Sequence, residues 1–129
     1  MLTAGILNPH LLSLLARVRH TNSLVIADWA FPSWPALETV DLSLVGGVPT
    51  VLQVLEAILP GWKCGAAFMA EEFLKHNPEA TRQRFTRLFP GGVLSFEPHL
   101  HLKARVPGAT GLIRTADTTV YSNILLVSG

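Results

Sequence analysis

A histidine and an aspartate bracket a short apolar run near the start of the chain. His20 is followed by a polar turn, by the apolar run 24–27 and then by Asp28. The run is too short and too continuously apolar for a surface helix, and it is typical of a buried strand. Asp28 would then lie at the carboxyl end of that strand, where ligands collect in open α/β sheets. An imidazole and a carboxylate in this position predict acid/base chemistry.

Further polar side chains stand near the ends of later apolar runs. They are His99, Lys103, Tyr121 and Asn123. Imidazole, carboxylate, phenol and amide groups together suit the hydroxyls of a sugar. Taken singly, each residue is at least as readily structural, since His20 could cap a helix and Asp28 could form a turn. Spacing alone does not establish that these side chains meet.

Five histidines raise the alternative of a metal site. His99 and His101 alternate with leucines, so both would face the same side of an extended segment. A metal is nevertheless the less favoured interpretation, because the chain has no zinc-module spacing and no HExxH motif. It also has no Gly-x-Ser-x-Gly elbow and no phosphate-binding glycine loop. The single cysteine, Cys64, has no orienting partner in sequence and is expected to be inert.

Helical and strand patterns alternate along the chain around these residues. Helices are predicted over 9–19, 50–59 and about 78–88. Strands are predicted over 24–28, 39–45, 62–70, 93–96, 112–114 and 124–127, with 99–103 extended and 104–111 a loop. Trp29 and Trp34, in the loop after Asp28, are expected to line a pocket or fill an interface. The alternation predicts a single α/β domain, 1–129, with a largely parallel sheet.

The composition bears on partners and location. Hydrophobic residues make up 49% of the chain and charged residues 15%, against about 25% charged residues in typical soluble domains. No apolar run approaches the ~18 residues of a membrane-spanning helix, and the first residues lack a signal-peptide pattern. We therefore expect a homo-oligomer without a membrane partner, in the cytoplasm, where a single cysteine fits the reducing conditions. The net charge of +1, with scattered basic residues, predicts no nucleic-acid partner.

Several separate motifs, in the right order, resemble the RbsD/FucU family of D-ribose pyranases and L-fucose mutarotases. The motifs are Gly5-Ile6-Leu7-Asn8, His20-Thr21 with Asp28, Asp41 with Gly47-Val48-Pro49, Ala70-Glu71-Glu72 with His76-Asn77-Pro78, and Tyr121-Ser122-Asn123. The resemblance covers nearly the whole chain. His99 with Lys103 four residues on favours the ribose-type branch, whereas Phe31-Pro32 is closer to the fucose type. Trp29 departs from the small residue expected after the aspartate.

The resemblance implies a three-layer α/β/α domain assembled into a ring-shaped decamer, with active sites at subunit boundaries. It implies a cofactor-independent isomerase that opens and recloses the ring of a free sugar, D-ribose or a related aldose such as L-fucose.

In this interpretation His20 is the general acid/base, and Asp28 orients it or accepts a sugar hydroxyl. The substrate-binding residues are Asp28, His99, Lys103, Tyr121, Ser122 and Asn123, with Tyr121 to Asn123 expected from a neighbouring chain. Two alternatives remain open. One is a non-catalytic monosaccharide-binding or sugar-transport accessory protein, and the other is a metal-dependent isomerase that uses His99 and His101.

Overall fold

A single six-stranded sheet forms the centre of the molecule, in a computed structural model that describes all residues 1–129. The strands are β1 (Ser23–Ala27), β2 (Thr39–Asp41), β3 (Cys64–Ala70), β4 (Leu94–Glu97), β5 (Gly111–Arg114) and β6 (Ile124–Ser128), in the order β2-β5-β1-β6-β3-β4. Strand β6 runs antiparallel to its neighbours β1 and β3, while all other pairs are parallel. The carboxyl ends of the parallel strands and the amino end of β6 therefore share one edge, and the prediction of a largely parallel sheet is confirmed.

The helices are α1 (Pro9–Arg17), α2 (Val51–Ile58), α3 (Glu71–His76), α4 (Glu79–Thr86) and α5 (His99–Arg105), with short 3₁₀ turns at Leu59–Gly61, Pro90–Gly92 and Val106–Gly108. Capping side chains fix the residues at which α1 and α2 begin. The Asn8 side chain accepts the N–H of Leu11 at 2.9 Å, and Thr50 and Gln53 form a reciprocal capping box, so backbone donors at the start of each helix are satisfied.

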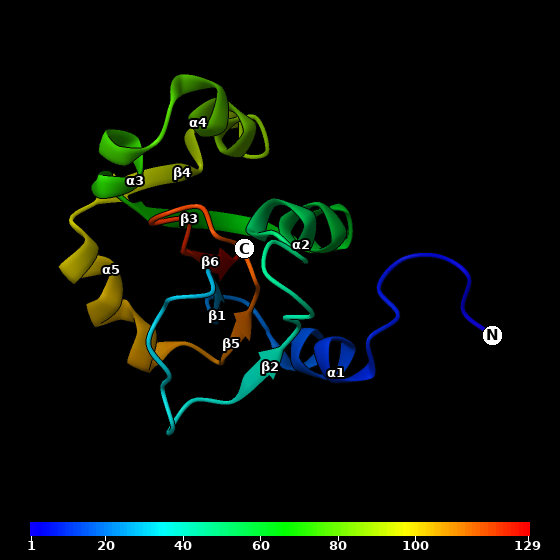
Figure 1. Cartoon of the computed structure of the whole chain (residues 1–129). Helices are drawn as coiled ribbons and strands as arrows, with labels where there is room; N and C mark the ends of the chain where they lie inside the picture. Colours follow the sequence, from blue (N-terminus) through cyan, green and yellow to red (C-terminus); the bar gives the residue numbers. More distant parts are fainter.

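Alternating side chains of the strands build two cores, one on each face of the sheet. In β1, Leu24 and Ile26 pack with α1, α2 and α4 in an 18-residue cluster, whereas Val25 and Ala27 belong to a second cluster with Leu102 of α5. Figure 1 shows α1 and α2 on one side of the strands and α5 on the other. The three-layer α/β/α architecture is confirmed.

One expected element is wrong: the segment around His99 is helix α5, not an extended strand. The alternation of histidine and leucine favoured a strand, but the buried residues are Leu102 and Val106, four apart, while Leu100 is exposed. Helical spacing therefore decides which side chains reach the core. As a consequence, His99 and His101 point in different directions, because residues two apart do not share a helix face.

Two smaller differences between the predicted and the observed elements have local causes. The strand expected over 39–45 ends at Asp41, whose carboxylate accepts the N–H of Ser43 at 2.9 Å and turns the chain. The sequence pattern does not predict helix α3, because its six residues are too few for a helical period to emerge. No helix in the structure combines the length and the apolarity needed to cross a bilayer.

Candidate active site

Three chain segments meet at the carboxyl edge of the sheet and enclose a pocket of about 300 Å³. That volume lies at the lower end of the roughly 300–1,000 Å³ range of small-molecule sites. The segments follow β1, follow β4 and precede β6, and they meet because β6 runs antiparallel. The lining residues are Asp28, Trp29, Ala30, Phe31, Pro32, His99, Thr118, Thr119, Val120, Tyr121 and Asn123.

Asp28 is the buried carboxylate of this pocket, with 6% of its surface exposed. One carboxylate oxygen accepts the backbone N–H groups of Ala30 and Phe31, at 3.0 and 2.9 Å. The Asp28 N–H in turn donates to the side-chain oxygen of Asn123 at 2.7 Å. Burial raises the pKa of the Asp28 carboxyl, with a smaller contribution from the charge of Asp117, while the hydrogen bonds act in the opposite direction. A carboxyl that ionises less readily is suited to exchange protons.

An imidazole and a phenol form another side of the pocket. The rings of His99 and Tyr121 meet edge to face with centroids 5.3 Å apart, and His99 meets Phe31 in the same manner at 6.3 Å. The backbone N–H of His99 donates to both oxygens of the Glu72 carboxylate at 3.2 Å. The buried Nδ1 atom of His99 has no hydrogen-bond partner, so one polar atom beside the pocket is unsatisfied.

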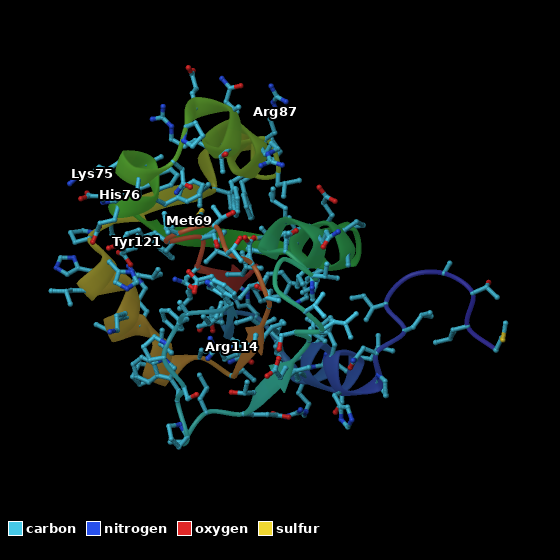
Figure 2. The ribbon with its side chains drawn as sticks, viewed as in Figure 1. Met69, Lys75, His76, Arg87, Arg114 and Tyr121 are labelled. Atoms are coloured by element: carbon cyan, nitrogen blue, oxygen red, sulfur yellow. The ribbon has the colours of Figure 1, made fainter.

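Arg114, at the end of β5, holds the loop that follows Asp28. Its Nη1 atom donates to the carbonyl oxygens of Asp28 and Phe31 at 3.0 and 2.6 Å, and Nη2 donates to that of Pro32 at 3.2 Å. The planar guanidinium can satisfy several acceptors at once, which a lysine cannot. Figure 2 shows Arg114 on the β5 side of the sheet, away from Tyr121.

The sequence-predicted residues divide into those that line the pocket and those that do not. Asp28, His99, Tyr121 and Asn123 line it. Lys103 lies one turn beyond His99 in α5 and is not among the lining residues. Ser122 is buried, and its hydroxyl donates to the carbonyl oxygen of Thr119 at 2.9 Å.

His20 lies at the opposite end of β1 from Asp28. The next residue, Thr21, donates its N–H to the carbonyl oxygen of Ser128 at the end of β6, and the His20 side chain is exposed. The strand between them spans roughly 13 Å at about 3.3 Å per residue. His20 therefore does not pair with Asp28 within one chain, contrary to the expected acid/base pair.

The expected division of the site between chains is also corrected. Tyr121 and Asn123 share a pocket with Asp28 of the same chain, because β1 and β6 are neighbours. It is His20 that is separated from the pocket.

Several pocket residues were not identified from the sequence as site residues. Thr118, Thr119 and Val120 line the pocket between the expected turn and Tyr121, and the polar turn was the only available signal. Trp29 lines the pocket and is 58% exposed, whereas Trp34 is half-buried and packs on Phe31. No three His, Cys, Asp or Glu side chains are grouped in a way that could hold a metal ion.

Comparison with known proteins gives consistent relatives along the whole chain. The chain is 41% identical over 130 residues to D-ribose pyranase of Geobacillus kaustophilus, covering 100% of this chain and 94% of the relative. It is 39% identical over 125 residues to D-ribose pyranase of Chromobacterium violaceum, covering 97% and 95%. The structure of Bacillus subtilis RbsD complexed with D-ribose superimposes with a TM-score of 0.92 at 29% identity, covering 100% and 98%.

These relatives favour the ribose-type branch. The model of the RbsD / FucU transport protein family matches residues 1–129. The chain belongs to this family.

Proposed function

We propose that this chain is a cofactor-independent isomerase that interconverts the cyclic forms of a free monosaccharide, with D-ribose as its first candidate substrate. The observation that carries the proposal is the buried Asp28 carboxyl, which faces a pocket shared with His99, Tyr121 and Asn123. The D-ribose pyranase relatives and the ribose complex of the Bacillus subtilis protein support the substrate class.

The chemistry needs one base and one acid. A base takes the proton of the anomeric hydroxyl while an acid protonates the ring oxygen, so that the bond between the anomeric carbon and the ring oxygen breaks and an aldehyde forms. The open chain then recloses through the same or another hydroxyl, and the protons return in reverse order. Positioned proton donors and acceptors typically contribute about 10²–10⁴-fold to such steps.

Asp28 is one of these proton-transfer groups, because burial raises the pKa of its carboxyl. Asn123, Tyr121 and His99 bind sugar hydroxyls, since amide, phenol and imidazole groups all donate hydrogen bonds. Lys103 and Ser122 act from outside the pocket, Lys103 as a positive charge on α5 and Ser122 by fixing the turn before β6.

His20 is the second proton-transfer group and is supplied by a neighbouring subunit. Its side chain is exposed and lies far from its own pocket, so it can serve only a pocket on another chain. A closed assembly of identical chains, such as a decameric ring, brings every His20 to an equivalent neighbouring pocket. Exposed apolar side chains are suited to such contacts. Trp29 and Val120 line the pocket, and Leu44, Val45 and Val48 are exposed elsewhere.

Saturation-transfer NMR on free sugars tests the proposal. The wild-type protein should accelerate exchange between the pyranose and furanose signals of D-ribose, and chelator should not change the rate. L-Fucose serves as the comparison substrate. His20→Ala should abolish the acceleration while the circular dichroism spectrum stays unchanged.

The same assay separates the alternatives. Binding of sugar without accelerated exchange would support a monosaccharide-binding accessory protein. Loss of exchange on addition of chelator would support a metal-dependent isomerase. Unchanged exchange in His20→Ala would remove His20 from the mechanism.

A further inference from the structure

Tyr121 occupies a backbone conformation that most side chains avoid. Its φ is +56°, in the left-handed region, where the Cβ atom crowds the following carbonyl oxygen. Such conformations persist only where the surroundings fix them. The contacts that hold Tyr121 in place therefore bear directly on where its phenol points in the pocket.

Two of these contacts come from the end of helix α3. The imidazole of His76 stacks on the Tyr121 ring, with centroids 5.4 Å apart and planes inclined by 27°. The next residue, Asn77, donates from its side-chain amide to the carbonyl oxygens of Phe73 and Val120, at 3.0 and 2.9 Å. Asn77 thus connects the end of α3 to the residue before Tyr121.

His76 contacts Tyr121 but does not line the pocket. It is exposed and makes no hydrogen bond through its imidazole. Stacking on Tyr121 is therefore the contact through which His76 can affect the pocket. His99 also meets the Tyr121 ring, edge to face, with centroids 5.3 Å apart. The Tyr121 ring therefore contacts one imidazole from α3 and one from α5. Figure 2 shows His76 and Tyr121 beside one another.

We propose that His76 is a positioning residue for Tyr121, acting through the stacked rings and together with the anchor that Asn77 provides. The inference rests on the proposed function, in which the Tyr121 hydroxyl binds a sugar hydroxyl. A hydrogen bond of this kind requires a heavy-atom distance of about 2.5–3.0 Å. A ring that can turn away from this position loses much of that interaction.

The chain offers a direct readout, because Tyr121 is its only tyrosine. Protein labelled with ¹³C in the tyrosine ring gives NMR signals from this residue alone, without added sugar. In the wild type, neighbouring rings displace these signals from the values of free tyrosine. His76→Ala should move them toward the free values, whereas His76→Phe, which keeps a stacking ring, should leave them displaced. Lys75→Ala, at the exposed neighbouring position, is the matched control and should have no effect.

The exchange assay then links the position of the ring to sugar binding. Tyr121 binds the sugar in both the ground state and the transition state, so its loss raises KM and not kcat. His76→Ala should raise KM about tenfold, the value of roughly one hydrogen bond, with kcat within about twofold of the wild type. His76→Phe should restore KM to within about twofold of the wild type.

Several outcomes would overturn the inference. One is a set of Tyr121 signals that does not change in His76→Ala. Another is a KM for His76→Phe as high as that for His76→Ala, which would show that the imidazole acts through its nitrogens. If His76→Ala loses structure, the Tyr121 signals and KM of His76→Phe, compared with those of His76→Gln, provide the same test.

The proposed function can fail separately. If the wild type accelerates no sugar exchange, the signals of Tyr121 still report whether His76 positions it.

Discussion

At the residue scale, Asp28 has structural contacts that are observed, and the proposed function gives the same side chain a chemical role. Its carboxylate fixes the turn through the N–H groups of Ala30 and Phe31, yet it is buried beside the charge of Asp117. Because burial raises the pKa of this carboxyl, ionised Asp28 is less favourable in the folded than in the unfolded protein. The protonated Asp28 carboxyl therefore contributes to the free energy of unfolding. This contribution is full below the unfolded pKa of about 3.9 and is lost as the pH rises through the pKa of the folded state.

Asp28→Asn should therefore lose activity and gain stability at neutral pH. The amide retains an oxygen for the two backbone donors but cannot exchange protons, so ring-form exchange should fall by about 10²–10⁴-fold. Urea unfolding at fixed protein concentration should show a stability gain over the wild type at pH 7 that disappears near pH 3. A variant less stable than the wild type at pH 7 would contradict this account.

Asp41→Asn provides a control of opposite sign. A hydrogen bond from Ser43 lowers the pKa of the largely exposed Asp41 carboxyl. Its stabilising contribution is present above the unfolded pKa and is lost as the pH falls through the folded value. This variant should lose stability at pH 7 and keep its exchange activity, since Asp41 does not line the site pocket.

At the element scale, the sequence predicted the strands better than the site they support. The run 24–27 predicted β1 and the place of Asp28, because a fully buried strand leaves a continuous apolar signature. Helix α5 was missed because its histidines and leucines fit a period of two as well as a helix. That Asp28 bonds to Asn123, 95 residues away, depends on β6 running antiparallel beside β1, which no local pattern encodes.

Arg114 was not predicted either, although it is the residue on which the loop after β1 depends. Its guanidinium donates to three carbonyl oxygens of that loop. Arg114→Met keeps much of the apolar stem and leaves these acceptors without a donor. We expect a loss of about 1–3 kcal/mol in the free energy of unfolding together with weaker sugar binding.

Chemical denaturation and sugar titration would check this expectation. Arg17→Met is a suitable control, because Arg17 also donates through both Nη atoms, but to the Glu38 carboxylate on the exposed surface. Exposed pairs contribute only about 0–1 kcal/mol, so this variant should stay close to the wild type. Equal losses in both variants would show that Arg114 has no special role in the loop.

At the scale of the whole molecule, the separation of His20 from Asp28 has a consequence that can be measured in mixed assemblies. If each site combines His20 of one chain with Asp28 of a neighbour, His20→Ala and Asp28→Asn are each inactive for complementary reasons. In hetero-oligomers of the two variants, some sites receive an intact His20 from one chain and an intact Asp28 from the other. A random one-to-one mixture should restore about a quarter of the sites.

The measurement uses co-expressed chains with different affinity tags, purified through both tags and assayed for D-ribose exchange. Recovery should require both variants in one assembly, and co-expression of His20→Ala with a chain carrying both substitutions should give none. Purified hetero-oligomers without recovered exchange would mean that His20 does not complete a neighbouring pocket. The pocket already contains Asp28, His99, Tyr121 and Asn123 of one chain. Sugar binding should therefore persist in His20→Ala while exchange is lost, because the substitution removes only the proton-transfer group that the neighbouring chain supplies.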